Sequence, residues 1–166
     1  TGASEIVEVH ASVDFLRRHG CKDLVLLYCV LSYPTADDDA HLLRIRTLQD
    51  EFVDAPVGFS DHTVPDDCVI VPSASVAVGA QAIEKHFTLD RALPGDDHYL
   101  SVDPEQLAVL VRNCRTIEAA LGDGKFGVHA SEEAARKFAR RSIVSDCFIA
   151  AGTEITRDML IMKRPG

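Results

Sequence analysis

The chain has 166 residues, of which 46% are hydrophobic and 26% charged, the composition of an ordinary globular protein that can bury a core. Its formal net charge of −9 argues against a nucleic-acid-binding surface, because such a surface needs clustered Lys and Arg. No apolar run approaches the roughly 20 residues that cross a bilayer and no signal peptide opens the chain, so the sequence predicts a soluble protein that does not associate with membranes.

The first predicted helix covers residues 4–19, with Ser4 as its N-cap and with apolar residues at helical spacing. Gly20 is expected to end this helix. The continuous apolar run over 23–29 then predicts a strand that is buried on both faces, which is typical of a parallel sheet.

The same alternation of helix and strand continues along the chain. We predict a helix over 39–52, a strand over 56–60, a helix over 68–78, a strand over 80–87, and a helix that Asp103 caps and Pro104 begins. Repeats of about 25–30 residues predict an α/β fold of βα units around a parallel sheet. Periodicity alone leaves open whether that sheet is open or closed into a barrel.

The pattern changes after Leu121. Residues 122–125 (GDGK) are typical of a flexible linker, and short β runs follow from Arg141. Three strands with four helices cannot close a barrel, and the final segment is too short to fold alone, so we expect further chain at both ends. The predicted domains are a barrel part over 1–121, a linker over 122–140 and the start of a small β-rich domain over 141–166.

The five cysteines are scattered and none has CxxC spacing: Cys21, Cys29, Cys68, Cys114 and Cys147. An odd number without paired spacing predicts neither a disulfide framework nor a zinc site of the finger type. We therefore expect reduced thiols in a cytoplasmic protein.

Two histidines close consecutive predicted strands, His62 in GFSDHT and His86 in IEKHFT. The carboxyl ends of parallel strands form the catalytic face of a barrel, and neighbouring strands are about 4.8 Å apart. Both imidazoles could therefore bind one metal ion. From this geometry alone, a histidine with a purely structural role remains the alternative for each.

Several motifs around these strand ends resemble the sialic acid synthase (N-acetylneuraminate synthase) family. They are YPT at 33–35, GFSDHT at 58–63, IEKHFTLD at 83–90, PGDDH at 94–98 and SVDP at 101–104. The tail, with Arg141-Ser142 and Lys163-Arg164-Pro165-Gly166, is similar to the family's linker and antifreeze-like (SAF) domain. The resemblance covers nearly the whole chain and implies the C-terminal units of a (β/α)₈ TIM barrel followed by a truncated SAF domain.

The resemblance implies an enzyme that condenses phosphoenolpyruvate with an N-acetylated amino sugar, such as N-acetylmannosamine, to give a nonulosonic acid and phosphate. His62 and His86 match the family's metal-binding histidines, with Mn²⁺ or Mg²⁺ as the expected ion. Asp97 joins them as a catalytic residue and, with Tyr33, matches contacts to the acceptor sugar. Ser60 matches a residue that hydrogen-bonds the phosphate of phosphoenolpyruvate.

Arg164 matches an arginine that reaches into the barrel of a partner subunit, so the resemblance implies a domain-swapped homodimer. A solvated arginine with no such role remains the alternative. Leu31 departs from the family pattern, because members often carry a polar residue there. Strand-end support is the expected role of the remaining polar residues of the two motifs, with catalysis as the alternative: Asp61, Glu84 and Lys85.

Two other functions stay open at this point. One is a metal-dependent barrel hydrolase or aldolase that uses the same two histidines, for which a third protein ligand would be usual. The other is a non-enzymatic binding module built on the antifreeze-like tail. The sequence does not choose among the amino sugars, and we expect residues 1–166 alone to be inactive.

Overall fold

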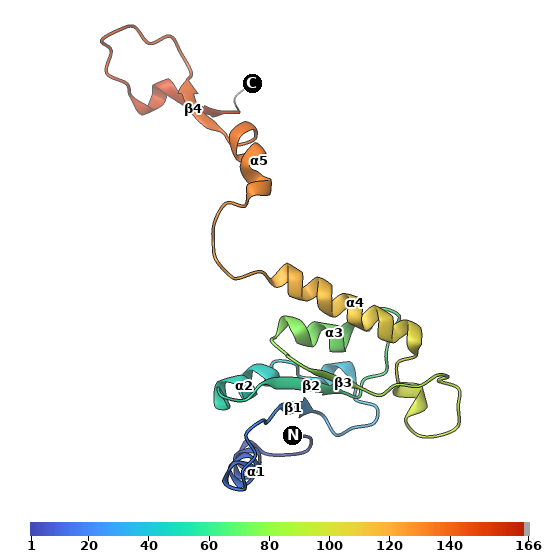
Figure 1. Ribbon diagram of the computed structural model, residues 1–166. Coiled ribbons are helices and arrows are strands. Elements are labelled where there is room, and N and C mark those ends of the chain that lie inside the picture. The colour runs from blue at the N-terminus through green and yellow to red at the C-terminus, as the bar shows by residue number, and fades with distance from the viewer. Residues whose placement is uncertain (165–166) are drawn as a thin grey trace. The chain divides into compact units, whose positions relative to one another are not determined.

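A computed structural model describes residues 1–164 of the protein (Figure 1). Pro165 and Gly166, which belong to the family-like tail, lie outside the described residues. The chain divides into two compact units, residues 1–123 and residues 124–166. Across residues 1–164, no helix combines the length and the apolar character needed to cross a membrane.

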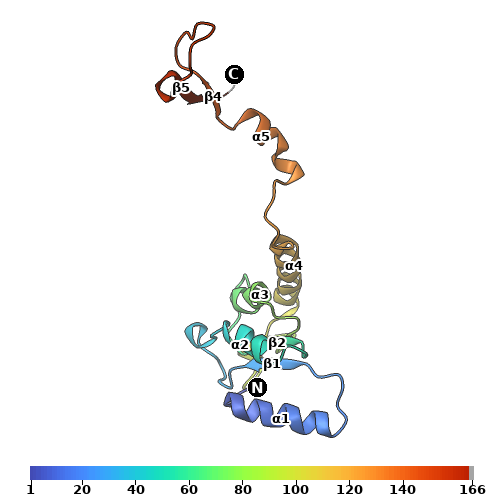
Figure 2. The same ribbon diagram turned by 90° about the vertical axis from the view of Figure 1, so that its left-hand side faces the viewer.

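The first unit is an α/β unit built on a parallel sheet, as predicted. Its strands are β1 (Leu26–Cys29), β2 (Val57–Asp61) and β3 (Ile83–Lys85), in the order β1-β2-β3. Helices alternate with these strands along the chain: α1 (Ile6–Arg18), α2 (Arg44–Glu51), α3 (Ile70–Ala77) and α4 (Pro104–Leu121). Figure 2 gives a second view of this arrangement.

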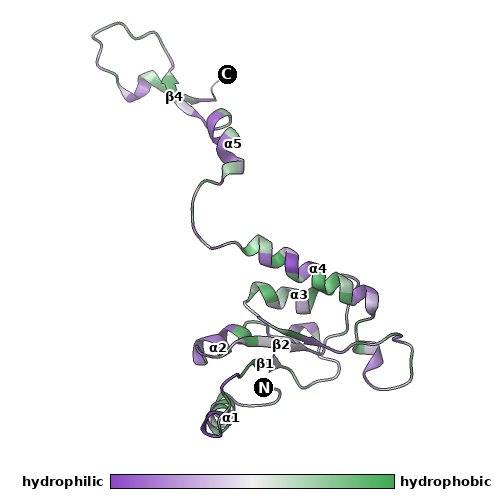
Figure 3. Cartoon of the chain, in the orientation of Figure 1, coloured by the Kyte–Doolittle hydropathy of each residue, from purple (hydrophilic) through white to green (hydrophobic). Residues whose placement is uncertain are grey.

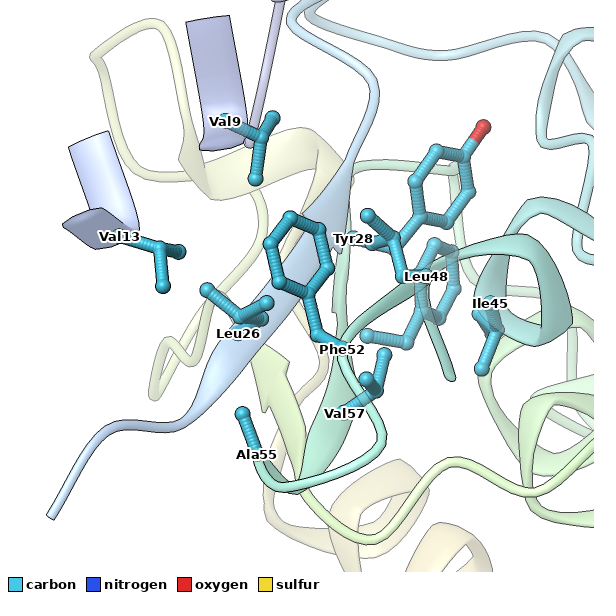
Figure 4. Close-up of a cluster of buried hydrophobic side chains, with 10 residues drawn as sticks. Val9, Val13, Leu26, Tyr28, Ile45, Leu48, Phe52, Ala55 and Val57 are labelled. Carbon is cyan, nitrogen blue, oxygen red and sulfur yellow. The ribbon is translucent and has the colours of Figure 1, made fainter. Parts of the chain in front are cut away.

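The core lies between the sheet and its helices, on one face of the sheet only. Alternate residues of β1 and β2 pack there with side chains of α1 and α2 (Figure 4): Leu26, Tyr28, Val57 and Phe59 with Val9, Val13, Ile45, Leu48 and Phe52. Val71 and Val78 bring α3 to the same cluster, and Ile83 of β3 packs with Leu110 of α4. Helices on a single face are what the wall of a barrel requires.

The other face of the sheet carries the remaining strand residues, because successive side chains point to opposite faces. Gly58 lies on this open face between its two neighbouring strands. A Cβ atom at Gly58 would meet the carbonyl oxygen of Ala82 at 2.5 Å and a side-chain carbon of Leu27 at 2.6 Å. Position 58 therefore has no room for a side chain.

A local sequence signal explains the start of α4. Asp103 caps α4 as predicted, since its carboxylate accepts a hydrogen bond from the Gln106 N–H at 2.8 Å, and Pro104 begins the helix. Helix α4 also alternates hydrophobic and hydrophilic residues along its length, as a helix with one packed face should (Figure 3).

Two helix starts differ from the prediction. Ser4 is not the cap of α1; Glu5 is, and its N–H donates to the Glu8 carboxylate at 2.7 Å in a capping box. Helix α2 begins at Arg44 rather than near residue 39, because His41 has a positive φ of 41°, which a helix cannot contain.

The second unit contains a short helix α5 (Glu133–Phe138) and two antiparallel strands, β4 (Ser142–Ser145) and β5 (Leu160–Lys163). Both predicted β runs are therefore strands. No side chain among residues 124–164 is buried, although β4 and β5 are largely apolar.

Candidate functional site

The structure brings the two predicted metal-binding histidines together. Strand β2 ends at Asp61 and β3 at Lys85, and these two residues are paired in the sheet. The next residues, His62 and His86, therefore leave neighbouring strands at the same edge, and their ring centroids are 5.2 Å apart.

His62 is held by the strand end of β1. Its Nδ1 lies 2.9 Å from the carbonyl oxygen of Val30, and its side chain is buried. Because a carbonyl oxygen only accepts hydrogen bonds, this contact places the proton on Nδ1 and leaves Nε2 with its lone pair. The Sγ atom of Cys29 lies 3.8 Å from the same Nδ1.

His86 has Asp97 beside it. The Nδ1 of His86 lies 3.6 Å from Oδ2 of Asp97, and the backbone oxygen of His86 accepts a hydrogen bond from Val102 at 2.9 Å. A carboxylate next to one nitrogen orients an imidazole and favours metal binding through the other. The sequence predicted Asp97 at the site, but it gave no sign that Asp97 contacts His86.

Tyr33 lies against both histidines, with ring centroids 4.1 Å from His62 and 5.7 Å from His86. Desolvation, followed by the negative charges of Cys29, Asp97 and Glu84, raises the pKa of the Tyr33 phenol. The hydroxyl therefore stays protonated at neutral pH and can donate a hydrogen bond to a ligand.

Ser60 is buried two residues before His62, and its hydroxyl donates to Oε1 of Glu84 at 2.7 Å. The sheet register pairs Ser60 with Glu84 directly. The sequence favoured strand-end support over catalysis for Glu84. The two-residue spacing of 60 and 62, and of 84 and 86, was the signal that all four side chains share the open face.

Asp61 and Lys85 form an ion pair on the opposite, helix-facing side. Lys85 Nζ lies 2.8 Å from Asp61 Oδ2, and both side chains are buried. Burial lowers the pKa of Lys85, and the carboxylate of Asp61 opposes that change.

Two positions that the sequence singled out are not part of this group. They are Leu31 and Arg164. Leu31 follows β1 and its side chain is 60% exposed, so an apolar residue borders the candidate site. Arg164 directly follows β5 in the second unit and is exposed.

A pair of histidines fits an ion that takes its other ligands from water and substrate. Among residues 1–164 there is no group of three or more His, Cys, Asp or Glu side chains that could hold a metal ion. With a metal–nitrogen bond of about 2.1 Å, two bound imidazoles have ring centres up to about 6.4 Å apart, so the observed spacing fits a shared ion.

A cavity of about 730 Å³ lies next to this group, between the start of α1, the end of β1 and α2. Tyr28 and Arg44 line it, together with Cys29 and Val30. Leu31 also lines this cavity, but neither histidine does, nor do Tyr33, Ser60 and Asp97, so the chemistry is expected on the open face of the sheet instead.

Comparisons with known proteins give one consistent result. The NeuB family model matches residues 1–126. An uncharacterized protein of Methanocaldococcus jannaschii is 45% identical over the whole chain and 48% of that relative, and the N,N'-diacetyllegionaminic acid synthase of Legionella pneumophila is 39% identical over the whole chain and 47% of the relative. The chain thus spans about half the length of these curated relatives.

The solved structures point the same way. The N-acetylneuraminic acid (sialic acid) synthetase of Leptospira borgpetersenii, crystallised with citrate, is similar with a TM-score of 0.73 and 36% identity. The match covers 82% of this chain and 46% of that one.

Proposed function

Because this chain belongs to the NeuB family, we propose that it forms the C-terminal part of the barrel of a sialic-acid-type synthase, followed by the start of an antifreeze-like domain. The proposed reaction condenses phosphoenolpyruvate with an N-acetylated amino sugar to give a nonulosonic acid and phosphate. The observation that carries the proposal is the convergence of His62 and His86 at the ends of neighbouring strands. Relatives named as synthases of such acids support it.

We propose that His62 and His86 hold one divalent ion, Mn²⁺ or Mg²⁺, through their Nε2 atoms. When bound, such an ion supplies Lewis-acid polarisation of the aldehyde oxygen of the open-chain sugar. The contacts of Nδ1 with Val30 and Asp97 support this assignment, because they leave the Nε2 atoms available.

The other residues of the open face would position the two substrates. Tyr33 donates a hydrogen bond to the sugar, and Asp97 accepts one from a sugar hydroxyl or amide. Ser60 binds the phosphate of phosphoenolpyruvate. Its single hydroxyl proton points to Glu84 in the structure, so the hydroxyl has to turn from the carboxylate to the phosphate when substrate binds.

The bond changes of the proposed reaction balance without a redox partner. C3 of phosphoenolpyruvate forms a bond to the sugar's aldehyde carbon, and the aldehyde oxygen ends as a hydroxyl. Water adds to C2, and inorganic phosphate leaves as the C2–O bond breaks. Holding both substrates at one edge of the sheet lowers the barrier, since correct positioning alone supplies several kcal/mol.

A metal-dependent hydrolase or aldolase is the less favoured function. A hydrolase would ordinarily show a third protein ligand, and residues 1–164 offer no such third side chain beside His62 and His86. The Legionella pneumophila synthase described above matches the whole chain, and none of the relatives described above is named as a hydrolase.

The direct test is phosphate release from phosphoenolpyruvate by the complete protein that carries this sequence. Each candidate sugar is supplied in turn: N-acetylmannosamine, its 6-phosphate, and diacetamido sugars. We expect phosphate and a nonulosonic acid to form in equal amounts with one of these sugars and not without a sugar. Release that is independent of every sugar, or no release with any, would contradict the proposal.

We further propose that the protein acts as a domain-swapped homodimer in which Arg164 caps the partner's sugar site. A hydrogen bond from a charged group typically contributes about 1.5–3 kcal/mol. Arg164→Ala is therefore expected to raise the sugar KM or lower kcat by roughly ten- to a hundredfold, while the KM of phosphoenolpyruvate changes much less. Initial rates over a matrix of both substrate concentrations measure this.

Mixed dimers separate capping in trans from capping in cis. A dimer of one Arg164→Ala and one His86→Ala subunit has one intact barrel, which belongs to the Arg164→Ala subunit and receives the normal arginine from its partner. Trans capping predicts that this dimer regains one competent site. If heterodimers form and no mixture exceeds its parents, Arg164 does not act across the dimer.

A further inference from the structure

Two charged residues that the proposed chemistry does not use lie directly behind the histidines. Asp61 is fully buried, the side chain of Lys85 is 3% exposed, and their Oδ2 and Nζ atoms are 2.8 Å apart. They are partners in the register of β2 and β3, and each is followed at once by a histidine, Asp61 by His62 and Lys85 by His86.

The same two residues also bind Thr63, the residue that follows His62. The N–H and the hydroxyl of Thr63 each donate to the Asp61 carboxylate at 3.1 Å, and Lys85 Nζ donates to the carbonyl oxygen of Thr63 at 2.5 Å. His62 is therefore the middle residue of a closed turn whose two ends are bound to Lys85.

The position of this network matters because the sheet ends there. The ladder between β2 and β3 stops at the pairing of Asp61 with Lys85. Beyond that point, the two strand ends are connected by the network rather than by ladder hydrogen bonds. Both side chains share the helix-facing side with Phe59 and Ile83, and Lys85 lines a cavity with Leu110 of α4, so neither points to the open face.

Stability alone is a weak reason for such a pair. Removing two charges from water costs several kcal/mol per ion, and an apolar pair of similar volume is often equally or more stabilising. The network does, however, restrict the turn that carries His62 and its distance from the strand end that carries His86.

We propose that the Asp61–Lys85 pair is a positioning device that keeps His62 and His86 at the separation a shared divalent ion requires. This inference rests on the proposed function, in which both histidines bind that ion. Loss of a partner that orients a metal-binding histidine typically weakens metal affinity about 10- to 100-fold. The Asp61–Lys85 pair orients both histidines through the backbone.

The test is the double variant Asp61→Asn/Lys85→Met in the complete protein. It removes the charged link between the strands and keeps an acceptor for the Thr63 N–H. Lys85→Met alone would leave the buried Asp61 carboxylate without its cation. We expect the Kd for Mn²⁺, measured from the signal of free Mn²⁺ in electron paramagnetic resonance, to rise about 10- to 100-fold. The unfolding temperature should fall by only a few degrees. The absorption spectrum of the Co²⁺ form should also change.

Val57→Ala is the matched control, because Val57 is fully buried at the other end of β2 on the same face. It should lower the unfolding temperature and leave the Kd for Mn²⁺ unchanged. If the double variant fails to fold, Thr63→Val carries the test, since it keeps the shape and removes one donor to Asp61; its Kd should rise several-fold.

The outcomes separate this inference from the proposed function. Wild-type protein that binds no Mn²⁺ would overturn the proposed metal site, and this inference with it. Wild-type protein that binds Mn²⁺, beside variants with the same Kd and the same Co²⁺ spectrum, would overturn the positioning role alone. In that case the Asp61–Lys85 pair would be purely structural.

Discussion

Replacing His86 by alanine in the complete protein is expected to lower kcat/KM by well over a hundredfold and to abolish metal-dependent turnover. His86 is one of only two protein side chains proposed to hold the ion, so its loss should exceed the roughly 10- to 100-fold effect of losing a residue that merely orients a ligand. The fold should survive, because the side chain is 27% exposed and lies past the end of the β3 ladder. Steady-state rates at increasing Mn²⁺ and a thermal unfolding curve measure the two effects.

His19→Ala is the control for this variant. His19 is exposed at the C-terminal end of α1, and both its side-chain hydrogen bond and its ring contact are with Phe15 of the same helix. Its removal should leave both Mn²⁺ dependence and kcat/KM unchanged. Full activity of His86→Ala, or of wild-type protein after chelation, would rule out a metal-binding role for His86.

The second large effect concerns residues 1–166 produced alone, which we expect to be inactive and either insoluble or molten. Strands β1 and β3 each pair with only one strand in the part of the chain that the structure describes. Unpaired strand edges and exposed apolar side chains promote association between copies. The α1 surface adds Val7 and Phe15, which are 69% and 58% exposed. Size-exclusion chromatography and phosphate release from phosphoenolpyruvate measure the two properties.

Placing a charge at the sheet edge tests whether exposed surface, rather than a general failure to fold, causes the insolubility. Val25 precedes β1 and is 52% exposed, so Val25→Lys places a charge at this edge and should increase the soluble fraction without restoring activity. A monodisperse wild-type chain that unfolds cooperatively would contradict the expectation for residues 1–166.

The parallel sheet could be predicted from the sequence, because a continuous apolar run precedes and includes β1 and a helical pattern separates each predicted strand from the next. β3 is not an apolar run, since it contains Glu84 and Lys85. The end of β2 and the cap of α4 followed from local signals, a buried strand and Asp103 before Pro104. The late start of α2 did not, because the positive φ of His41 depends on the tertiary course of the chain and has no local signal.

The candidate site could be predicted in part. The meeting of His62 with His86 follows from strand order, since both residues end neighbouring parallel strands. The contact of His86 with Asp97 depends on a loop of ten residues between them, whose path no periodicity describes. The hydrogen bond from Ser60 to Glu84 could have been predicted. Each residue lies two positions before a histidine on its own strand, and residues two apart along a strand share a face.

The crowding around Gly58 limits how this sequence can change over generations. Any replacement adds a Cβ atom that meets the backbone oxygen of Ala82, which cannot rotate away as a side chain can. The side chain of Leu31, which is exposed at the open face, can therefore be replaced without such a clash, whereas every substitution at position 58 requires the backbone at Ala82 to move. Sequence change should accordingly leave Gly58 untouched and accumulate at exposed positions around the open face.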